Sequence, residues 1–180
     1  MEREDKGFVL WITGLPASGK TTLARELKRR LSDMGRRVEL LDGDEVRRWL
    51  SPEAGFTRED RERHLRRVAY VSKLLARNGV VVIASFVSPY RKIRDEVRKI
   101  VEEDAPFIEV YVRCPLEVAM ERDPKGLYRR ALAGEIKNFT GIDDPFEEPE
   151  NPEVVVDSSA MNVDEEVERV MSELRSHSLI

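Results

Sequence analysis

The sequence of 180 residues contains a single cysteine, Cys114, and no glutamine. One cysteine excludes an internal disulfide and is typical of proteins in a reducing compartment. Cys114 follows an apolar run and precedes a proline, which favours a small buried side chain over a reactive thiol. Charged residues make up 37% of the chain. High charge with few amides occurs in heat-adapted proteins, although compositional drift explains it equally well.

Long apolar runs and an excess of positive charge are also missing. The longest apolar stretch, Val80–Val87, is far shorter than the roughly 20 residues that cross a bilayer. Lys and Arg total 31 and Asp and Glu total 35, so a net charge of −4 gives no global basic surface for nucleic acid. The charged start, Met1–Gly7, does not resemble a signal or transit peptide. We expect a soluble, cytoplasmic protein with no nucleic-acid or membrane partner.

Short β-rich runs alternate with helical segments along the chain. The predicted strands are Phe8–Thr13, Val38–Leu41, Val80–Ala84, Phe107–Val112 and Val154–Val156. Apolar residues recur at helical spacing in the segments between most of them and after the last one. The alternation predicts one domain, residues 1–180, with a doubly wound α/β fold and a parallel five-stranded sheet flanked by helices.

One long segment, residues 123–152, is polar, rich in Gly and Pro, and without sustained periodicity. A loop of about 30 residues is unusual in a compact domain unless it has a function. We therefore expect this segment to be a lid over a site.

Directly after the first predicted strand, the sequence matches the P-loop pattern G-x-x-x-x-G-K-[ST]. The matching residues are Gly14, Leu15, Pro16, Ala17, Ser18, Gly19, Lys20 and Thr21. Glycines let backbone N–H groups approach phosphates, and the N-terminus of the following helix adds positive charge. Lys20 is predicted to reach the β- and γ-phosphates, and the Thr21 hydroxyl to hold Mg²⁺. Thr22 is included in this cofactor-binding segment, although capping or packing also explains it.

The context supports the motif, because it lies between an apolar strand and an amphipathic helix. A chance match is expected in roughly one chain of this length in a hundred. The segment therefore predicts a P-loop NTPase fold that binds ATP with Mg²⁺.

Two features favour a small-molecule kinase over other P-loop proteins. The N-K-x-D segment that reads guanine in GTP switches does not occur. Motor-type ATPases usually end a buried strand in an acid, whereas the run Val80–Ala84 continues into Ser85. The acids Asp42 and Asp44 instead follow the second predicted strand, at the edge where α/β sheets bind ligands. One of them could orient Mg²⁺ or accept a hydroxyl proton. The alternative is that both only cap the next helix.

Further segments follow the P-loop in a fixed order. They are Asp42-Gly43-Asp44-x-x-Arg47, Gly55-Phe56-Thr57, Asp60-Arg61, Arg66-Arg67, Phe86-Val87-Ser88-Pro89-Tyr90-Arg91, Arg122-Asp123-Pro124-Lys125-Gly126-Leu127-Tyr128 and Phe139-Thr140-Gly141-Ile142-Asp143. Together they resemble the adenylyl-sulfate kinase family, over roughly Phe8–Val156.

The resemblance implies an activity and a set of site residues. The family transfers the γ-phosphate of ATP to the ribose 3′-hydroxyl of adenylyl sulfate (APS), giving 3′-phosphoadenylyl sulfate (PAPS) and ADP. Phe56 and Phe139 would sandwich the adenine, and planar guanidinium groups suit the anionic groups. The implied substrate-binding residues are Asp44, Arg47, Phe56, Arg61, His64, Val87, Ser88, Lys125, Asn138 and Phe139. A homodimer is also implied.

The implied catalytic residues are Lys20, Asp42 and Ser88. Asp42 matches the catalytic acid of the family and would act as a base or, with Thr21, as a ligand of Mg²⁺. Ser88 matches a serine described as a phosphoserine intermediate, but no base that would activate it is evident in the sequence. A substrate contact is therefore the alternative for Ser88.

His64 departs from the family, which commonly has a substrate-contacting asparagine there. A histidine still donates one hydrogen bond, and a charged one would attract an anion. The alternative is an exposed histidine on a helix. Two other functions are also left open: another small-molecule kinase, for a nucleoside or a sugar acid, and a regulatory nucleotide-binding subunit without turnover.

Overall fold

In a computed structural model of the chain, residues 6–180 are described. Residues 1–5, part of the start that we predict to carry no targeting signal, lie outside them. The described strands form one parallel sheet with the order β2-β3-β1-β4-β5. They are β1 (Phe8–Thr13), β2 (Val38–Asp42), β3 (Val81–Ser85), β4 (Phe107–Arg113) and β5 (Val154–Asp157). The predicted parallel five-stranded α/β sheet is confirmed, with strand ends shifted by a residue at most.

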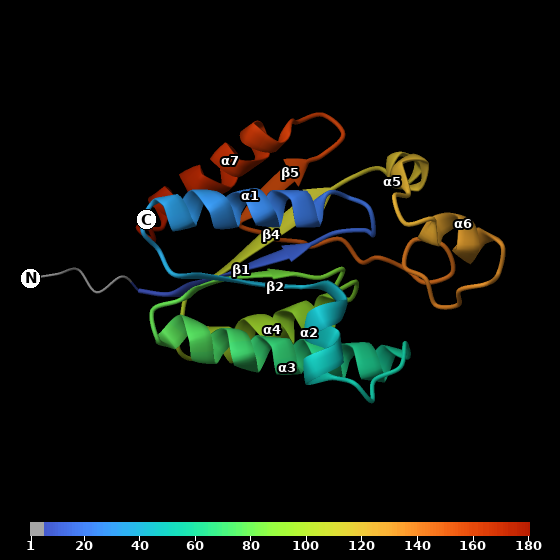
Figure 1. Cartoon of the computed structure of the whole chain (residues 1–180), viewed down its shortest axis with the longest axis horizontal. Coiled ribbons are helices and arrows are strands. Elements are labelled where there is room, and N and C mark those ends of the chain that lie inside the picture. The colour runs from blue at the N-terminus through green and yellow to red at the C-terminus, as the bar shows by residue number, and fades with distance from the viewer. Residues whose placement is uncertain (1–5) are drawn as a thin grey trace, which may run out of the picture.

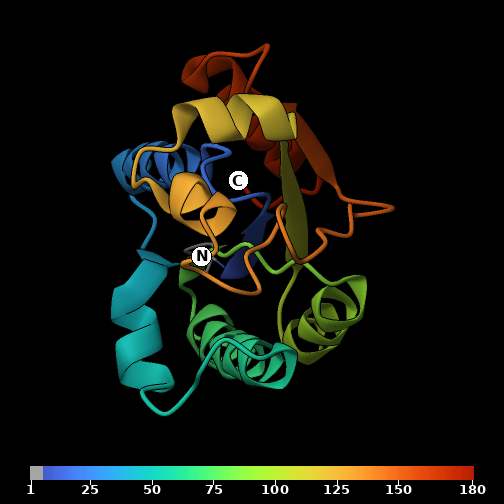
Figure 2. The ribbon, with the colours of Figure 1, turned by 90° about the vertical axis from the view of Figure 1, so that its right-hand side faces the viewer.

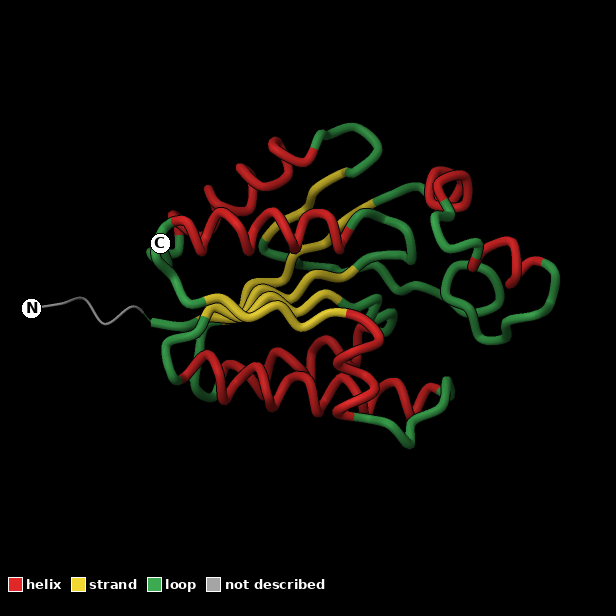
Figure 3. The backbone as a smooth tube through the Cα atoms, viewed as in Figure 1, coloured by secondary structure: helices red, strands yellow, loops and turns green. Residues whose placement is uncertain are grey.

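Helices cover both faces of the sheet (Figure 1, Figure 3). On one side lie α1 (Lys20–Asp33) and α7 (Val163–Ser176), and on the other α3 (Arg58–Arg77) and α4 (Arg91–Glu102). Successive residues of a strand point to opposite faces. Leu10 and Ile12 of β1 accordingly join the core under α1 and α7, whereas Val9 and Trp11 join the core under α3 and α4. This burial on both faces explains the continuous apolar runs.

The carboxyl ends of the central strands meet at one edge, where Ser85 pairs with both Asp42 and Ile12. Three short helices lie near this edge (Figure 2). They are α2 (Gly43–Leu50), α5 (Leu116–Arg122) and α6 (Leu127–Leu132). The sequence patterns predict neither α2 nor α6, because α2 has no buried residue and α6 has only six residues.

The segment 123–152 is ordered around α6 and touches the P-loop. The buried carboxylate of Asp123 accepts hydrogen bonds from the backbone N–H groups of Tyr128 (3.0 Å) and Arg129 (3.1 Å). The Tyr128 hydroxyl donates to the carbonyl of Pro16 at 2.7 Å. The segment thus rests directly on the phosphate-binding loop. Among the described helices, none is long and apolar enough to cross a bilayer.

Candidate active site

The P-loop connects β1 to α1 and leaves the start of that helix without side-chain acceptors. Its N-cap residue, Gly19, has φ 101°, and neither a capping side chain nor an acidic residue occupies the first turn. The free N–H groups and the helix dipole therefore suit an anion. Gly14 must lack a side chain, because a Cβ there would lie 2.6 Å from the Val112 carbonyl oxygen.

Lys20 points back into the loop. Its Nζ donates hydrogen bonds to the carbonyl oxygens of Gly14 (3.0 Å) and Leu15 (2.8 Å). Burial lowers the pKa of Lys20 to about 8, although the carboxylate of Asp42 acts in the opposite direction. A desolvated ammonium group with two carbonyl partners would gain most from an anion, because the charge of a phosphate compensates for the hydration that the group has lost. The cradle therefore fits the phosphates of ATP.

Asp42 and Thr21 face each other at the carboxyl edge of the sheet. The Thr21 hydroxyl donates to Asp42 Oδ2 at 3.1 Å. Asp42 occupies the N-cap position of α2, but its side chain makes no capping hydrogen bond there. A hydroxyl beside a carboxylate is a donor set that suits Mg²⁺ completed by phosphate and water oxygens. Within residues 6–180 no three acidic, cysteine or histidine side chains gather for a metal. Thr22 is exposed and does not pack against the core.

A cavity of about 850 Å³ opens beside the P-loop residue Pro16. It brings together nine of the ten predicted substrate-binding residues: Asp44, Arg47, Phe56, Arg61, His64, Val87, Ser88, Asn138 and Phe139. Lys125 is exposed and is not among its lining residues. The residues come from α2, the α2–α3 loop, α3, the β3–α4 loop and the segment 123–152. Most of this grouping therefore depends on the tertiary fold.

Two arginines of the cavity are held in place by neighbours. The Arg47 guanidinium lies 4.8 Å from the ring centroid of Phe56 and donates to the carbonyl of Gly55. Arg61 forms an ion pair with Asp144 at 2.5 Å. The Tyr90 hydroxyl also donates to Asp144, at 2.6 Å. The cavity therefore contains oriented cations and the exposed ring of Phe56, features that suit an anion joined to a flat ring.

The Ser88 hydroxyl is bonded within the protein. Its Oγ accepts from Trp11 Nε1 at 3.1 Å and lies 3.0 Å from Thr13 Oγ1. The backbone at Ser88 has φ 40°, in the left-handed region that side chains disfavour. The buried guanidinium of Arg94 stabilises this conformation by donating to the Ser88 carbonyl at 2.6 Å and to the Glu147 carbonyl. Arg94 thereby joins the β3–α4 loop to the end of the segment 123–152.

His64 is buried, with 4% of its surface exposed, so the alternative of an exposed helix histidine is wrong. Burial, and then the charges of Arg47 and Arg67, lower the pKa of His64 to about 4. The neutral form of His64 is therefore expected near neutral pH in the free protein, rather than a charged imidazole that attracts anions. The sequence contains the signal for this burial, because His64, Val68 and Ser72 follow one another at intervals of four and are all buried on α3.

We predict that His64 makes the protein sensitive to acid. Its pKa is lower in the folded than in the unfolded state, so the unfolded state binds more protons. The contribution of neutral His64 to the free energy of unfolding is fully present above about pH 6.5. It is lost as pH falls toward about 4. The expected loss is about 2 to 3 kcal/mol. Urea unfolding at several pH values should show a shallower pH dependence for His64→Asn, and equal slopes would contradict the prediction.

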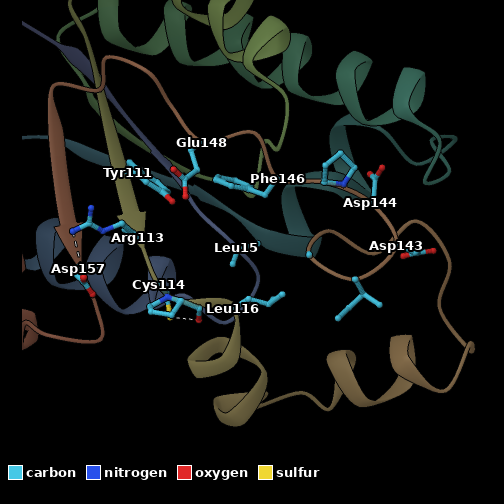
Figure 4. A pocket seen from close by; sticks show the side chains of 14 residues that line it. Leu15, Tyr111, Arg113, Cys114, Leu116, Asp143, Asp144, Phe146, Glu148 and Asp157 are labelled. Carbon is cyan, nitrogen blue, oxygen red and sulfur yellow. Dashed lines mark hydrogen bonds and ion pairs between the residues drawn. The ribbon is translucent and has the colours of Figure 1, made fainter.

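A second cavity, of about 660 Å³, lies between the end of β4 and residues 141–148 (Figure 4). Its charged lining residues are one arginine, Arg113, and four acids: Asp143, Asp144, Glu148 and Asp157. Arg113 lies 3.6 Å from Asp157. This acidic lining disfavours phosphate or sulfate groups, so the cavity of about 850 Å³ is the better site for an anionic acceptor.

Sequence analysis missed several residues of the site. Tyr90 and Asp144 orient Arg61, Arg94 holds Ser88, and Ser51 contacts His64. Tyr90 belongs to one of the segments that carry the family resemblance, but the sequence alone assigns it no function. Most of these contacts join residues far apart in the sequence, so spacing alone does not reveal them.

The parallel sheet, the P-loop and the adjoining cavity with its two oriented arginines define a P-loop kinase. The sequence profile of the adenylylsulphate kinase family matches residues 6–157. The chain is 56% identical over 169 residues to a probable adenylyl-sulfate kinase of Aeropyrum pernix, which covers 93% of this chain and 92% of that protein. The chain therefore belongs to the adenylyl-sulfate kinase family.

Two solved structures agree with this assignment. An APS kinase of Mycobacterium tuberculosis in complex with AMPPNP and APS superposes with a TM-score of 0.91 at 38% identity, over 94% of this chain and 98% of that one. A hexameric APS kinase from Thiobacillus denitrificans superposes with a TM-score of 0.76 at 34% identity. The match covers 99% of this chain but 30% of that longer chain.

Proposed function

We propose that the chain transfers the γ-phosphate of ATP to the 3′-hydroxyl of adenylyl sulfate, forming PAPS and ADP. The observation that carries the proposal is the cavity beside the P-loop, which combines Arg47, Arg61, Phe56 and Phe139. Two guanidinium groups suit the phosphate–sulfate anhydride, and two aromatic side chains suit the adenine. The complex of the M. tuberculosis relative with AMPPNP and APS supports the same pair of ligands.

The donor side of the reaction depends on the P-loop. Lys20 and the N–H groups at the start of α1 would hold the β- and γ-phosphates and stabilise the charge that develops during transfer. Thr21 and Asp42 would hold Mg²⁺. When bound, Mg²⁺ neutralises charge on the transferring phosphate. Asp42 is half-buried at the edge of the sheet, where it would also be placed to accept the proton of the hydroxyl.

On the acceptor side, Arg47 and Arg61 would bind the anionic groups, and the rings of Phe56 and Phe139 would enclose the base. The Phe139 ring already packs edge-on against Tyr128, with 5.0 Å between the centroids. Asp44, Val87 and Asn138 also line the cavity. Because Phe139 and Asn138 belong to the segment 123–152, we propose that this segment acts as a lid. Lys125 would contact the substrate only after a movement of this lid.

For Ser88 we propose a contact and positioning role. Among residues 6–180, the hydrogen-bond partners of its hydroxyl are the Trp11 indole N–H, the Thr13 hydroxyl and the Phe86 carbonyl, and none of these is a base. A nucleophilic serine needs an adjacent base. In-line transfer assisted by positioning and electrostatics does not require a covalent intermediate.

The test is ADP formation from Mg-ATP with APS as acceptor, beside adenosine, AMP, gluconate and a control without acceptor. We expect ADP and PAPS with APS alone. Turnover with gluconate or adenosine instead would assign another small-molecule kinase. ATP binding without transfer to any acceptor would assign a regulatory subunit.

We further propose that the protein is a homodimer in the cytoplasm. Trp49 on α2 is 77% exposed and Tyr70 on α3 is 54% exposed, which provides apolar surface for contact between copies. A solved relative is hexameric, so light scattering should distinguish two copies from six.

A further inference from the structure

A polar cluster lies behind the wall of the cavity, between the end of α2 and the first half of α3. Ser51 Oγ and His64 Nδ1 are 2.8 Å apart, and both residues are buried. Arg67 Nη1 lies 3.1 Å from Ser51 Oγ and 2.9 Å from the carbonyl oxygen of Leu50. Arg67 also pairs with Glu53 at 2.5 Å. The serine is therefore located between a permanent cation and an imidazole.

The donors and acceptors of this cluster determine where the imidazole proton lies. A guanidinium group only donates, so Ser51 Oγ must accept from Arg67. If His64 Nδ1 also donated to Ser51, the hydroxyl proton of this buried serine would have no partner among the described residues. Buried polar groups are rarely left unpaired. The hydroxyl therefore donates to Nδ1, and the neutral imidazole carries its proton on Nε2.

The Nε2–H group is the part of the imidazole left for a ligand. His64 lines the cavity of about 850 Å³. Nε2 has no hydrogen-bond partner among residues 6–180, yet it is not one of their fully enclosed unpaired atoms. The charged groups around the ring are Arg47 on α2, Arg67 on α3 and Glu53 in the loop between these helices. Burial, and then two cations against one anion, oppose protonation of Nδ1, so the ring stays a neutral donor.

We propose that Ser51, held by Arg67, fixes His64 in the Nε2–H form, and that this N–H is a hydrogen-bond donor to the acceptor nucleotide. Ser51 and Arg67 act as positioning residues, since neither needs to touch the substrate. The second half of the proposal rests on the proposed function, whereas the tautomer is a property of the free protein. An asparagine at position 64 keeps an N–H donor without needing a partner to select a tautomer.

The tautomer is measured by NMR on protein labelled with ¹⁵N-histidine. The chain contains two histidines, and His177 is exposed beside Glu173, so a His177→Asn variant assigns both. We expect His64 to show a protonated Nε2 and an unprotonated Nδ1, without titration between about pH 5.5 and about pH 8.5. In Ser51→Ala the share of the Nε2–H form should fall, whereas Ser51→Thr, which keeps the hydroxyl, should preserve it.

The kinetic test separates positioning from general damage. Ser51→Ala should raise KM for APS about threefold to tenfold and change kcat little, because one neutral hydrogen bond is weakened. In a His64→Asn background the same change should have no further effect, because the asparagine has no tautomer to select. Equal effects in both backgrounds would overturn the proposal.

Other outcomes overturn it as well. An Nδ1–H tautomer in the unmutated protein, or an unchanged tautomer in Ser51→Ala, contradicts the claim that Ser51 fixes the Nε2–H form. A changed tautomer in Ser51→Ala with an unchanged KM for APS contradicts the claim that this N–H binds the acceptor nucleotide. Failure of the proposed function is recognised separately, because the unmutated protein would then form no PAPS; the donor role would fall with it, while the NMR spectra would still decide the tautomer.

Discussion

Replacing Asp42 with alanine is expected to lower kcat for PAPS formation about a hundredfold to ten-thousandfold. The carboxylate lies 3.1 Å from the Thr21 hydroxyl at the carboxyl end of β2. Either proposed role, Mg²⁺ ligand or base, acts on the step in which the phosphate moves. The loss should therefore appear in kcat more than in KM for APS. Steady-state kinetics with saturating Mg-ATP measure it.

The matched control is Asp44→Ala, on the exposed first turn of α2. Asp44 lines the cavity of about 850 Å³ that we propose for the acceptor, so its loss should mainly raise KM for APS.

Asp42→Asn separates the two roles of Asp42. If Asp42 acts mainly as a metal ligand, the variant should need more Mg²⁺. If Asp42 is the base, the variant should lose the acidic limb of the pH–rate profile at unchanged Mg²⁺ requirement. An Asp42→Ala variant with near-normal kcat, folded by circular dichroism, would contradict both.

The sheet and the phosphate cradle are predictable from the sequence because their signals are local. Strands β1 and β3 are buried on both faces, so they read as unbroken apolar runs. The P-loop pattern is specific because backbone geometry at Gly14 and Gly19 requires glycine. Helix α2 lacks such a signal. None of its residues is buried, and its packing depends on neighbours that the sequence does not place.

The side-chain contacts around the cavity of about 850 Å³ are less predictable from the sequence than the sheet and the P-loop. Arg61 and Asp144 are separated by 83 residues, and Arg94 and Glu147 by 53. Contacts of this kind depend on how the segment 123–152 returns across the sheet. His64 is an intermediate case. Its spacing on the buried stripe of α3 predicts burial, but the lowered pKa also requires Arg47 from another helix.

Replacing Lys20 with alanine is expected to lower kcat/KM for Mg-ATP about a hundredfold to a thousandfold, since one charged donor to the transferring phosphate is lost. The structure also predicts how pH affects nucleotide binding. Burial lowers the pKa of Lys20 to about 8. Bound phosphates favour the ammonium form, so the pKa in the complex must be higher. Affinity for a non-hydrolysable ATP analogue should then fall as pH rises above about 8, by at most about tenfold per pH unit.

Two variants identify Lys20 as the origin of this slope. Lys20→Ala should bind the analogue weakly and independently of pH in this range, since no ammonium group is left to lose its proton. Lys20→Arg keeps its positive charge at every pH used, because an arginine side chain is effectively always protonated. It should therefore also lose the slope, whatever its affinity. Calorimetric titration at several pH values between about 7 and about 9.5 measures all three proteins. A slope that persists in Lys20→Arg would assign the pH dependence to another group and remove the link between the buried ammonium and phosphate binding.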